Sequence, residues 1–225
     1  MQKIAENLWT LRYPLSLLGA DVGRRVTVVR LWSGELVIHS TGPFSADDIV
    51  AINALGKPAW LVEATNVHDT FAREGSTAFP LARYFAPPGF EKFSGIPTES
   101  LATPPRDWGG ELEVLPLGGV PRVHEHAFFH RPSRTLIVAD VLFNVGSEMS
   151  AWTRLLLRLV AGLKGGPGVS RIFRKLAIRD PAALRASLRK VLEWDFDRVI
   201  VAHGNVIETD GRRALTQALH TAGLA

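Results

Sequence analysis

Short apolar runs alternate with polar segments along the chain, and one run leads directly into an acid. Residues 136–139 are all apolar, Asp140 follows them, and residues 141–143 are apolar again. This pattern predicts a strand that is buried on both faces and ends at a carboxylate. Because an unpaired carboxylate in apolar surroundings is costly, Asp140 needs a cation, a metal ion or several hydrogen-bond donors. The plainer interpretation is that Asp140 turns the chain or caps a helix.

Alternating and β-branched stretches predict eight further strands. One of them, residues 122–130, places His124, His126 and His130 on a single face. A half-exposed strand with polar residues pointing outward is the simpler interpretation of that face, and a metal site is the other. The predicted strands cover residues 8–13, 25–32, 35–39, 59–64, 81–86, 112–117 and 122–130, and an eighth, residues 197–202, ends the series.

Capping residues predict where several helices begin. Ser45 is a candidate N-cap for a helix through Leu55, and Asp180 precedes a helix over residues 182–193. A C-terminal helix is expected at residues 211–222.

Two further segments, residues 149–163 and 169–178, are leucine-rich and basic. They are compatible with a partly buried helix pair that has a solvated basic rim, with a homodimer interface, or with a surface that contacts membrane.

Composition narrows the class of protein. The chain has 225 residues, 46% of them hydrophobic, which is enough to form one domain over residues 1–225. It has no cysteine, so any metal must be bound by His, Asp or Glu, and the composition fits a reducing cytoplasm. A formal charge of +4 does not by itself indicate a nucleic-acid partner. The first residues lack the apolar core of a signal peptide, and no window predicts an integral membrane segment.

Three predicted strands end at a residue that can bind metal. His68 lies in the polar loop after residues 59–64, Asp140 ends the run described above, and His203 follows residues 197–202. Strand ends at one edge are where α/β folds place ligand sites. Two imidazoles and one carboxylate suit zinc, iron or manganese.

The order of these elements resembles the metallo-β-lactamase-like hydrolase superfamily. DRVIVAHGNVI resembles its last strand and ligand histidine, TLIVADVLF resembles the strand with its bridging aspartate, and residues 61–71 occupy the place of its HxHxDH loop. RVTVVRLWSGELVIHS and YFAPPG resemble a poorly characterised bacterial branch of it. The resemblance implies an α/β fold, a four-layer αββα sandwich of two mixed sheets flanked by helices, with the metal site at one edge.

The HxHxDH loop is degenerate in this chain. Aligned with the motif, only His68 is retained, while Asn66, Thr70 and Phe71 replace the first histidine, the acid and the last histidine. The chain is therefore compatible with a single ion bound by His68, Asp140 and His203 in place of two, or with no ion at all. Zinc is the first choice and iron or manganese are the alternatives.

Two residues outside the three strand ends are candidates for a supporting role. Glu125 is a candidate fourth ligand or a partner of the ligands, and Asp69 is a second candidate for the same place. Both are candidates to relay protons, and Asp140 would both bind metal and orient the nucleophile.

Two functions follow from this interpretation. The first is a metal-dependent hydrolase that acts on an ester, amide, thioester or phosphodiester, with the small-molecule substrate unknown. The second is a protein that keeps the fold without catalysis and acts as a binding or scaffolding module.

Overall fold

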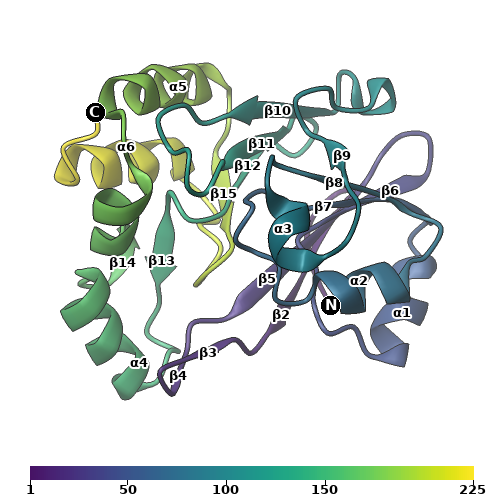
Figure 1. Ribbon diagram of the computed structural model, residues 1–225, viewed down its shortest axis with the longest axis horizontal. Coiled ribbons are helices and arrows are strands. Elements are labelled where there is room, and N and C mark those ends of the chain that lie inside the picture. The colour runs from purple at the N-terminus through teal and green to yellow at the C-terminus, as the bar shows by residue number, and fades with distance from the viewer.

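Two mixed β-sheets form the centre of the computed structural model, which describes residues 1–225 (Figure 1). Seven strands lie in the first sheet in the order β1-β2-β5-β6-β7-β8-β9, and four lie in the second in the order β10-β11-β12-β15. The first sheet consists of β1 (Gln2–Ala5), β2 (Leu8–Tyr13), β5 (Arg24–Arg30), β6 (Glu35–His39), β7 (Lys57–Val62), β8 (Arg83–Ala86) and β9 (Glu99–Ser100). The second consists of β10 (Leu112–Pro116), β11 (His126–His130), β12 (Thr135–Val138) and β15 (Arg198–Val201).

Strand direction places the site-bearing loops. In the first sheet β5 and β6 are antiparallel, whereas β6, β7 and β8 run parallel. In the second sheet β12 and β15 are parallel, with Thr135 opposite Arg198 and Val138 opposite Val201. Because β12 and β15 end side by side, the residues that follow them emerge at the same edge of this sheet.

Period-two alternation within the strands divides the apolar side chains between separate layers. Ile137 and Ile200 face the layer between the sheets, where Val37 and Trp60 meet them from the first sheet. Their neighbours in the same strands, such as Leu136, turn to the opposite face and pack under helices. The buried strands therefore carry apolar side chains on both faces. The fold is the predicted αββα sandwich.

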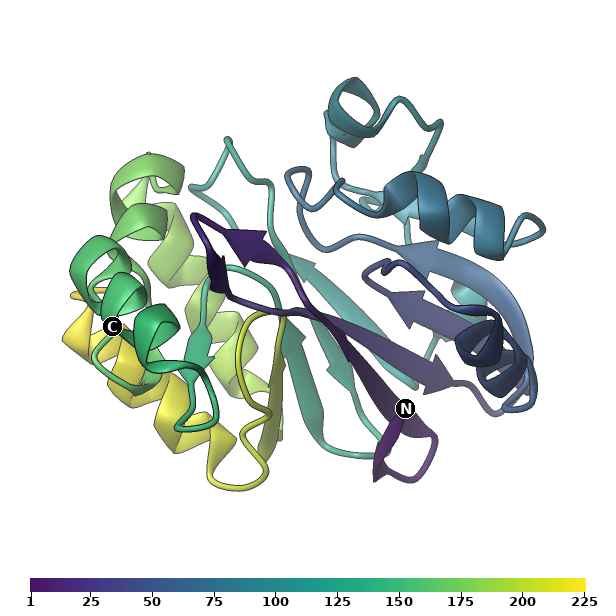
Figure 2. The same cartoon turned by 90° about the horizontal axis from the view of Figure 1, so that it is seen from below.

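Helices cover the two outer faces (Figure 2). On the first sheet Ile52, Ala72 and Phe90 pack from three helices, and on the second Leu188 and Leu215 pack from two more. The helices are α1 (Ala46–Asn53), α2 (Ala72–Ala78) and α3 (Phe90–Ser94) on the first sheet, α5 (Pro181–Glu193) and α6 (Gly211–Thr221) on the second, and α4 (Ala151–Leu156).

Short elements complete the chain. A hairpin of β3 (Ser16–Leu17) and β4 (Ala20–Asp21) and a ribbon of β13 (Phe143–Val145) and β14 (Gly166–Gly168) lie outside the two sheets. The 3-10 turn η1 covers Arg106–Trp108, and π-helical turns form η2 (Leu157–Ala161) and η3 (Phe173–Ala177). No helix is both long and apolar enough to cross a membrane.

The predicted helix caps at Ser45 and Asp180 are confirmed. Ser45 and Asp48 form a reciprocal capping box, and the Asp180 carboxylate accepts hydrogen bonds from the first turn of α5. The two basic segments, predicted as helices over residues 149–163 and 169–178, are only partly confirmed. In the first, α4 begins at Ala151 and continues as the π-helical turn η2, and the second contains only the short turn η3.

The predicted strand over residues 122–130 is wrong in its first half. β11 begins at His126, and His124 lies in a turn with a left-handed φ of 47°, where its N–H donates to the Val120 carbonyl. The three histidines therefore do not share one strand face. The prediction of a half-exposed face is also wrong, because His126 and His130 are both buried.

Candidate metal centre

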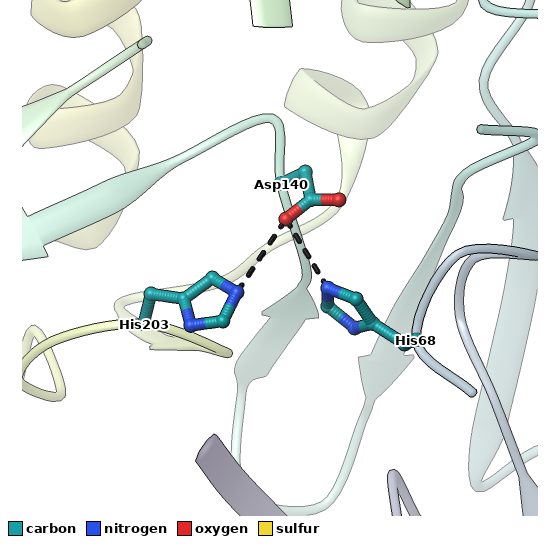
Figure 3. Close-up of side chains that lie close together, drawn as sticks. All are labelled: His68, Asp140 and His203. Carbon is teal, nitrogen blue, oxygen red and sulfur yellow. Dashed lines mark hydrogen bonds and ion pairs between the residues drawn. The ribbon is translucent and has the colours of Figure 1, made fainter. Parts of the chain in front are cut away.

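His68, Asp140 and His203 meet at one edge of the sandwich. The loop after β7 brings His68, the turn after β12 brings Asp140, and the end of β15 brings His203. Figure 3 shows both imidazoles directed at the same carboxylate oxygen. His68 Nε2 lies 3.2 Å from Asp140 Oδ1, and His203 Nε2 lies 3.6 Å from it. One donor atom from each residue lies within 4.8 Å of the others.

His203 is held in one tautomer by the backbone that immediately precedes β5. Its Nδ1 lies 2.7 Å from the Gly23 carbonyl oxygen, which can only accept, so Nδ1 carries the proton. In the neutral ring the lone pair is then on Nε2, which faces Asp140. Phe143 stacks on the same ring, with centroids 5.2 Å apart. The orientation of His203 is therefore set before any ligand binds, as is usual for metal-binding histidines.

The glycine after His203 is required by close backbone packing. Gly204 has a φ of 102°, and a Cβ built on it would lie 2.0 Å from the Asn144 carbonyl oxygen. Its own carbonyl accepts a hydrogen bond from Arg25 Nη2 at 2.6 Å. A glycine directly after His203 is thus a steric need of the fold.

Arg24 supports the His68 loop through a buried ion pair. Its Nη2 donates to Glu63 Oε2 at 2.7 Å and to the His68 carbonyl at 3.1 Å. The other oxygen of Glu63 accepts hydrogen bonds from the Thr41 backbone and hydroxyl and from Tyr84. The paired charges are almost completely buried, with 3% of the Arg24 side chain and none of the Glu63 side chain exposed. The loop is therefore fixed at its backbone.

Glu125 supports the turn that carries Asp140. Its Oε1 accepts hydrogen bonds from the N–H groups of Ala139 at 2.9 Å and Val141 at 3.2 Å, on either side of the aspartate. The side chain is fully buried, and Oε2 has no partner. Burial and the nearby charge of Asp140 raise the pKa of Glu125 to about 8. Glu125 therefore lies behind Asp140, outside the group of three donor atoms.

The protonation states of the cluster suit metal binding. Burial, reinforced by the charge of Arg24, lowers the pKa of His68 although Asp140 opposes this shift. Burial would raise the pKa of Asp140, but the two imidazoles outweigh it and keep that pKa below its usual range. At neutral pH His68 is thus a neutral imidazole and Asp140 a carboxylate, which are the forms that ligate metals.

The separations between Asp140 Oδ1 and the two imidazole nitrogens also fit a divalent ion. Ligand atoms about 2.0–2.1 Å from a tetrahedral zinc ion lie about 3.3 Å apart, close to the two separations measured from Asp140 Oδ1. With Nδ1 directed at the Gly23 carbonyl, His203 Nε2 faces the Asp140 carboxylate, an arrangement that a cation between them would stabilise. Three protein ligands would leave a fourth position open, as in catalytic zinc sites.

An apolar cavity adjoins the cluster. Its volume is about 670 Å³, and Asp140 and His203 form part of its wall. One side is formed by residues on and next to the β3–β4 hairpin, and the other by η2 and η3. Its apolar lining includes Leu15, Leu17, Val22, Phe143, Leu157, Ile172, Phe173 and Leu176.

The remaining sequence candidates lie outside the cluster. Asp69 follows His68 but contributes no donor atom to the group of three. Asn66, in the place of the first motif histidine, donates through Nδ2 to the Pro88 carbonyl at 3.3 Å. Phe71, in the place of the last one, precedes the first turn of α2. The loop thus contributes one residue, His68, to the cluster.

Three supporting groups escaped the sequence interpretation, namely Gly23, Arg24 with Glu63, and Arg25. The signal was present, because RR precedes the apolar run VTVV and Glu63 ends the apolar run AWLV. Charges inside a buried strand require partners. Pattern alone did not show which partner each charge would find.

Comparison with known proteins places the chain in a family. Residues 5–163 match the family described as "Domain of unknown function (DUF4336)". The chain belongs to this family. No curated protein matches the sequence.

Solved structures show that this family member has the metallo-β-lactamase fold. The metallo-β-lactamase of Erythrobacter litoralis has a TM-score of 0.68 at 14% identity, over 100% of this chain and 96% of that chain. The one from Pontibacter korlensis has a TM-score of 0.66 at 15% identity, over 99% and 96%. FIM-1 from Pseudomonas aeruginosa, in a mono-zinc form, has a TM-score of 0.66 at 12% identity, over 100% and 96%. The chain is a divergent protein of this fold.

Proposed function

We propose that this protein is a hydrolase that uses one divalent metal ion, with zinc as the first choice and iron or manganese as alternatives. The observation that carries the proposal is the convergence of His68, Asp140 and His203 at the wall of an apolar cavity. When bound there, a divalent ion lowers the pKa of a water molecule and polarises a carbonyl or phosphoryl group. The mono-zinc form of FIM-1 supports a site of this fold with a single ion.

The residues of this chain would prepare the site for that chemistry. Asp140 directs Oδ1 at the two histidines, while no protein group hydrogen-bonds to Oδ2. Oδ2 can therefore accept a hydrogen bond from the attacking water and orient it. Glu125 and Arg24 fix the backbones on which Asp140 and His68 stand, so these side chains would not need to reorganise during the reaction.

The cavity limits the class of substrate. A lining that is mainly apolar favours a substrate with an apolar group next to the scissile bond, because the cavity removes that group from water. The bond itself would be an ester, thioester, amide or phosphodiester. Arg122, the one basic residue in the lining, could pair with an anionic end of the substrate.

A second candidate is a binding module without catalysis. It is favoured by Asn66 and Phe71, which stand where the motif has ligand histidines, and by the engagement of Asn66 with Pro88. In that case the cavity would bind a ligand without cleaving it.

Metal content distinguishes the two candidates. We expect about one zinc, iron or manganese ion per chain in protein that has not met a chelator, and a loss of most of it in His203→Ala. His220→Ala, which removes an exposed histidine of α6, is the matched control and should retain the metal. Elemental analysis by mass spectrometry gives the readout. If the protein stays free of metal after incubation with excess Zn²⁺, Mn²⁺ or Fe²⁺, the hydrolase proposal fails and the binding module remains as the candidate function.

Hydrolysis assays then test the substrate class. Nitrophenyl esters of increasing acyl length should be cleaved with rising kcat/KM until the chain fills the cavity, and His203→Ala should abolish this activity. Equal rates with acetyl and longer esters would contradict a role for the apolar lining.

A further inference from the structure

Basic charge is concentrated in one segment of the chain. Residues 149–179 contain seven basic residues and no acidic one. Because the whole chain has 26 basic and 22 acidic residues, the remainder carries a net charge of −3. The seven are Arg154, Arg158, Lys164, Arg171, Arg174, Lys175 and Arg179.

None of these seven cations is neutralised within the protein. All seven are exposed, and no carboxylate lies within ion-pair distance of any of them. Arg154, Arg174 and Arg179 donate only to backbone carbonyls. The cations are therefore free to meet an anionic partner.

Large exposed apolar side chains lie in the same region. Eight of the fourteen in the protein are in residues 149–179 or at the tip of the β3–β4 hairpin. The most exposed are Leu18 (73%) and Leu159 (64%). The full set is Leu17, Leu18, Trp152, Leu155, Leu159, Val160, Ile172 and Leu176. Together with the seven cations they form what we call the basic–apolar face.

The basic–apolar face borders the cavity of the candidate metal centre. In Figures 1 and 2 the β3–β4 hairpin lies beside α4 and the helical turns that follow it. Leu17, Ile172 and Leu176 belong both to this face and to the cavity wall, which continues inward to Asp140 and His203. The face and the mouth of the site are thus one continuous surface.

We propose that the basic–apolar face docks on a lipid bilayer that contains anionic lipids. Exposed leucine and tryptophan next to arginine and lysine is the composition of surfaces that lie in the membrane interface. The apolar side chains would enter the boundary between headgroups and acyl chains. The seven unpaired cations would contact lipid phosphates or carboxylates, and each cation near an anionic surface contributes about a factor of five to binding.

Charge and composition argue against two other occupants. A second copy in a two-fold dimer would place the same seven cations against each other, with no acidic residue in the segment to relieve the repulsion. Nucleic-acid interfaces are highly polar, whereas eight large apolar side chains are exposed here. An anionic bilayer satisfies both the charge and the apolar surface.

Docking would place the cavity mouth at the bilayer, so that an amphiphile with an acyl chain could pass from the membrane to the cluster. This consequence rests on the proposed function. The docking itself does not, because it needs neither metal nor activity.

Co-sedimentation with vesicles tests the proposal. We expect the protein to bind vesicles of phosphatidylcholine with about one third phosphatidylglycerol at least ten times more strongly than pure phosphatidylcholine vesicles. The triple variant Arg158→Gln, Arg171→Gln, Lys175→Gln should bind the anionic vesicles about 100-fold more weakly. The matched control Arg73→Gln, Arg189→Gln, Lys190→Gln removes the same charge from exposed positions on α2 and α5 and should bind within about two- to threefold of the parent.

Two further measurements separate insertion from charge attraction. Trp152 is 53% exposed on this face, so its fluorescence should shift to the blue on vesicle binding, and Trp152→Phe should remove the shift. Leu159→Ser with Leu176→Ser should weaken binding even at low salt. His203→Ala should bind vesicles as the parent does.

Equal binding by the two triple variants, or no binding to anionic vesicles at low salt, would overturn the proposal. So would a dimer in sedimentation analysis that the Arg158, Arg171 and Lys175 variant disrupts, or tighter binding to an oligonucleotide than to vesicles.

Discussion

Two buried glutamates support the candidate metal centre by different physical means. Glu63 lies under the His68 loop and pairs with Arg24, whose guanidinium also holds the His68 carbonyl. Glu125 lies under Asp140 and has no cation, only backbone N–H groups. Both carboxyls are completely buried. His68 is therefore positioned through an ion pair, and Asp140 through amide donors alone.

Glu63 has a cationic partner and Glu125 has none, and this difference follows from the charges of His68 and Asp140, the side chains that they support. His68 is neutral, so an Arg–Glu pair beneath it brings no net charge to the site. Asp140 is anionic, and a second carboxylate behind it is repelled, which is why the pKa of Glu125 is raised to about 8. At neutral pH Glu125 is thus mostly protonated and can serve as an acceptor without adding a second negative charge.

The largest expected effect is the loss of the ion pair. In Glu63→Gln the Arg24 guanidinium stays buried without a counter-ion, and we expect the free energy of unfolding to fall by about 3–5 kcal/mol. Urea denaturation measures it. Glu35→Gln, which breaks the exposed pair with Lys57, is the control and should cost less than about 1 kcal/mol. Equal decreases in the free energy of unfolding for the two variants would show that the buried ion pair stabilises the fold no more than the exposed one.

A smaller effect is expected when the amide acceptor is removed. Glu125→Ala leaves the N–H groups of Ala139 and Val141 without their acceptor and should lower the free energy of unfolding by about 1–3 kcal/mol. Because the Asp140 turn is then free to move, metal affinity should fall about 10- to 100-fold. Denaturation and metal titration are the two measurements. Unchanged metal affinity in a destabilised variant would reduce Glu125 to a purely structural role.

The smallest effect at acidic pH is expected for Glu125→Gln, which retains a neutral acceptor. At pH 5 its stability should lie within about 1 kcal/mol of the parent. The ordinary pKa of a glutamate carboxyl is 4.5, and the pKa of Glu125 in the folded protein is about 8. Between these two pH values the folded parent keeps a proton on Glu125 that the unfolded chain has released. As the pH rises from about 4.5 to about 8, the parent therefore loses stability relative to the variant. Parallel curves of unfolding free energy against pH would contradict the raised pKa.

The sequence by itself determined most of the strands and several of the helices, while the layer arrangement came from the family resemblance. Apolar runs located the buried strands, Ser45 and Asp180 marked two helix starts, and the strand ends placed His68, Asp140 and His203 together. These predictions succeed because they rest on local rules, since alternation, capping and the parallel ends of neighbouring strands depend on a few adjacent residues.

Only the tertiary structure decided what lies behind and around those residues. Arg24 and Glu63 are separated by 39 positions, and His203 and Gly23 by 180. His126 and His130 were expected to face outward but are buried, because alternation shows which side chains share a face and not what covers it. The cavity joins the hairpin at residues 16–21 to helical turns more than a hundred residues later. Contacts across such separations arise from the packing of whole layers, and no local pattern encodes them.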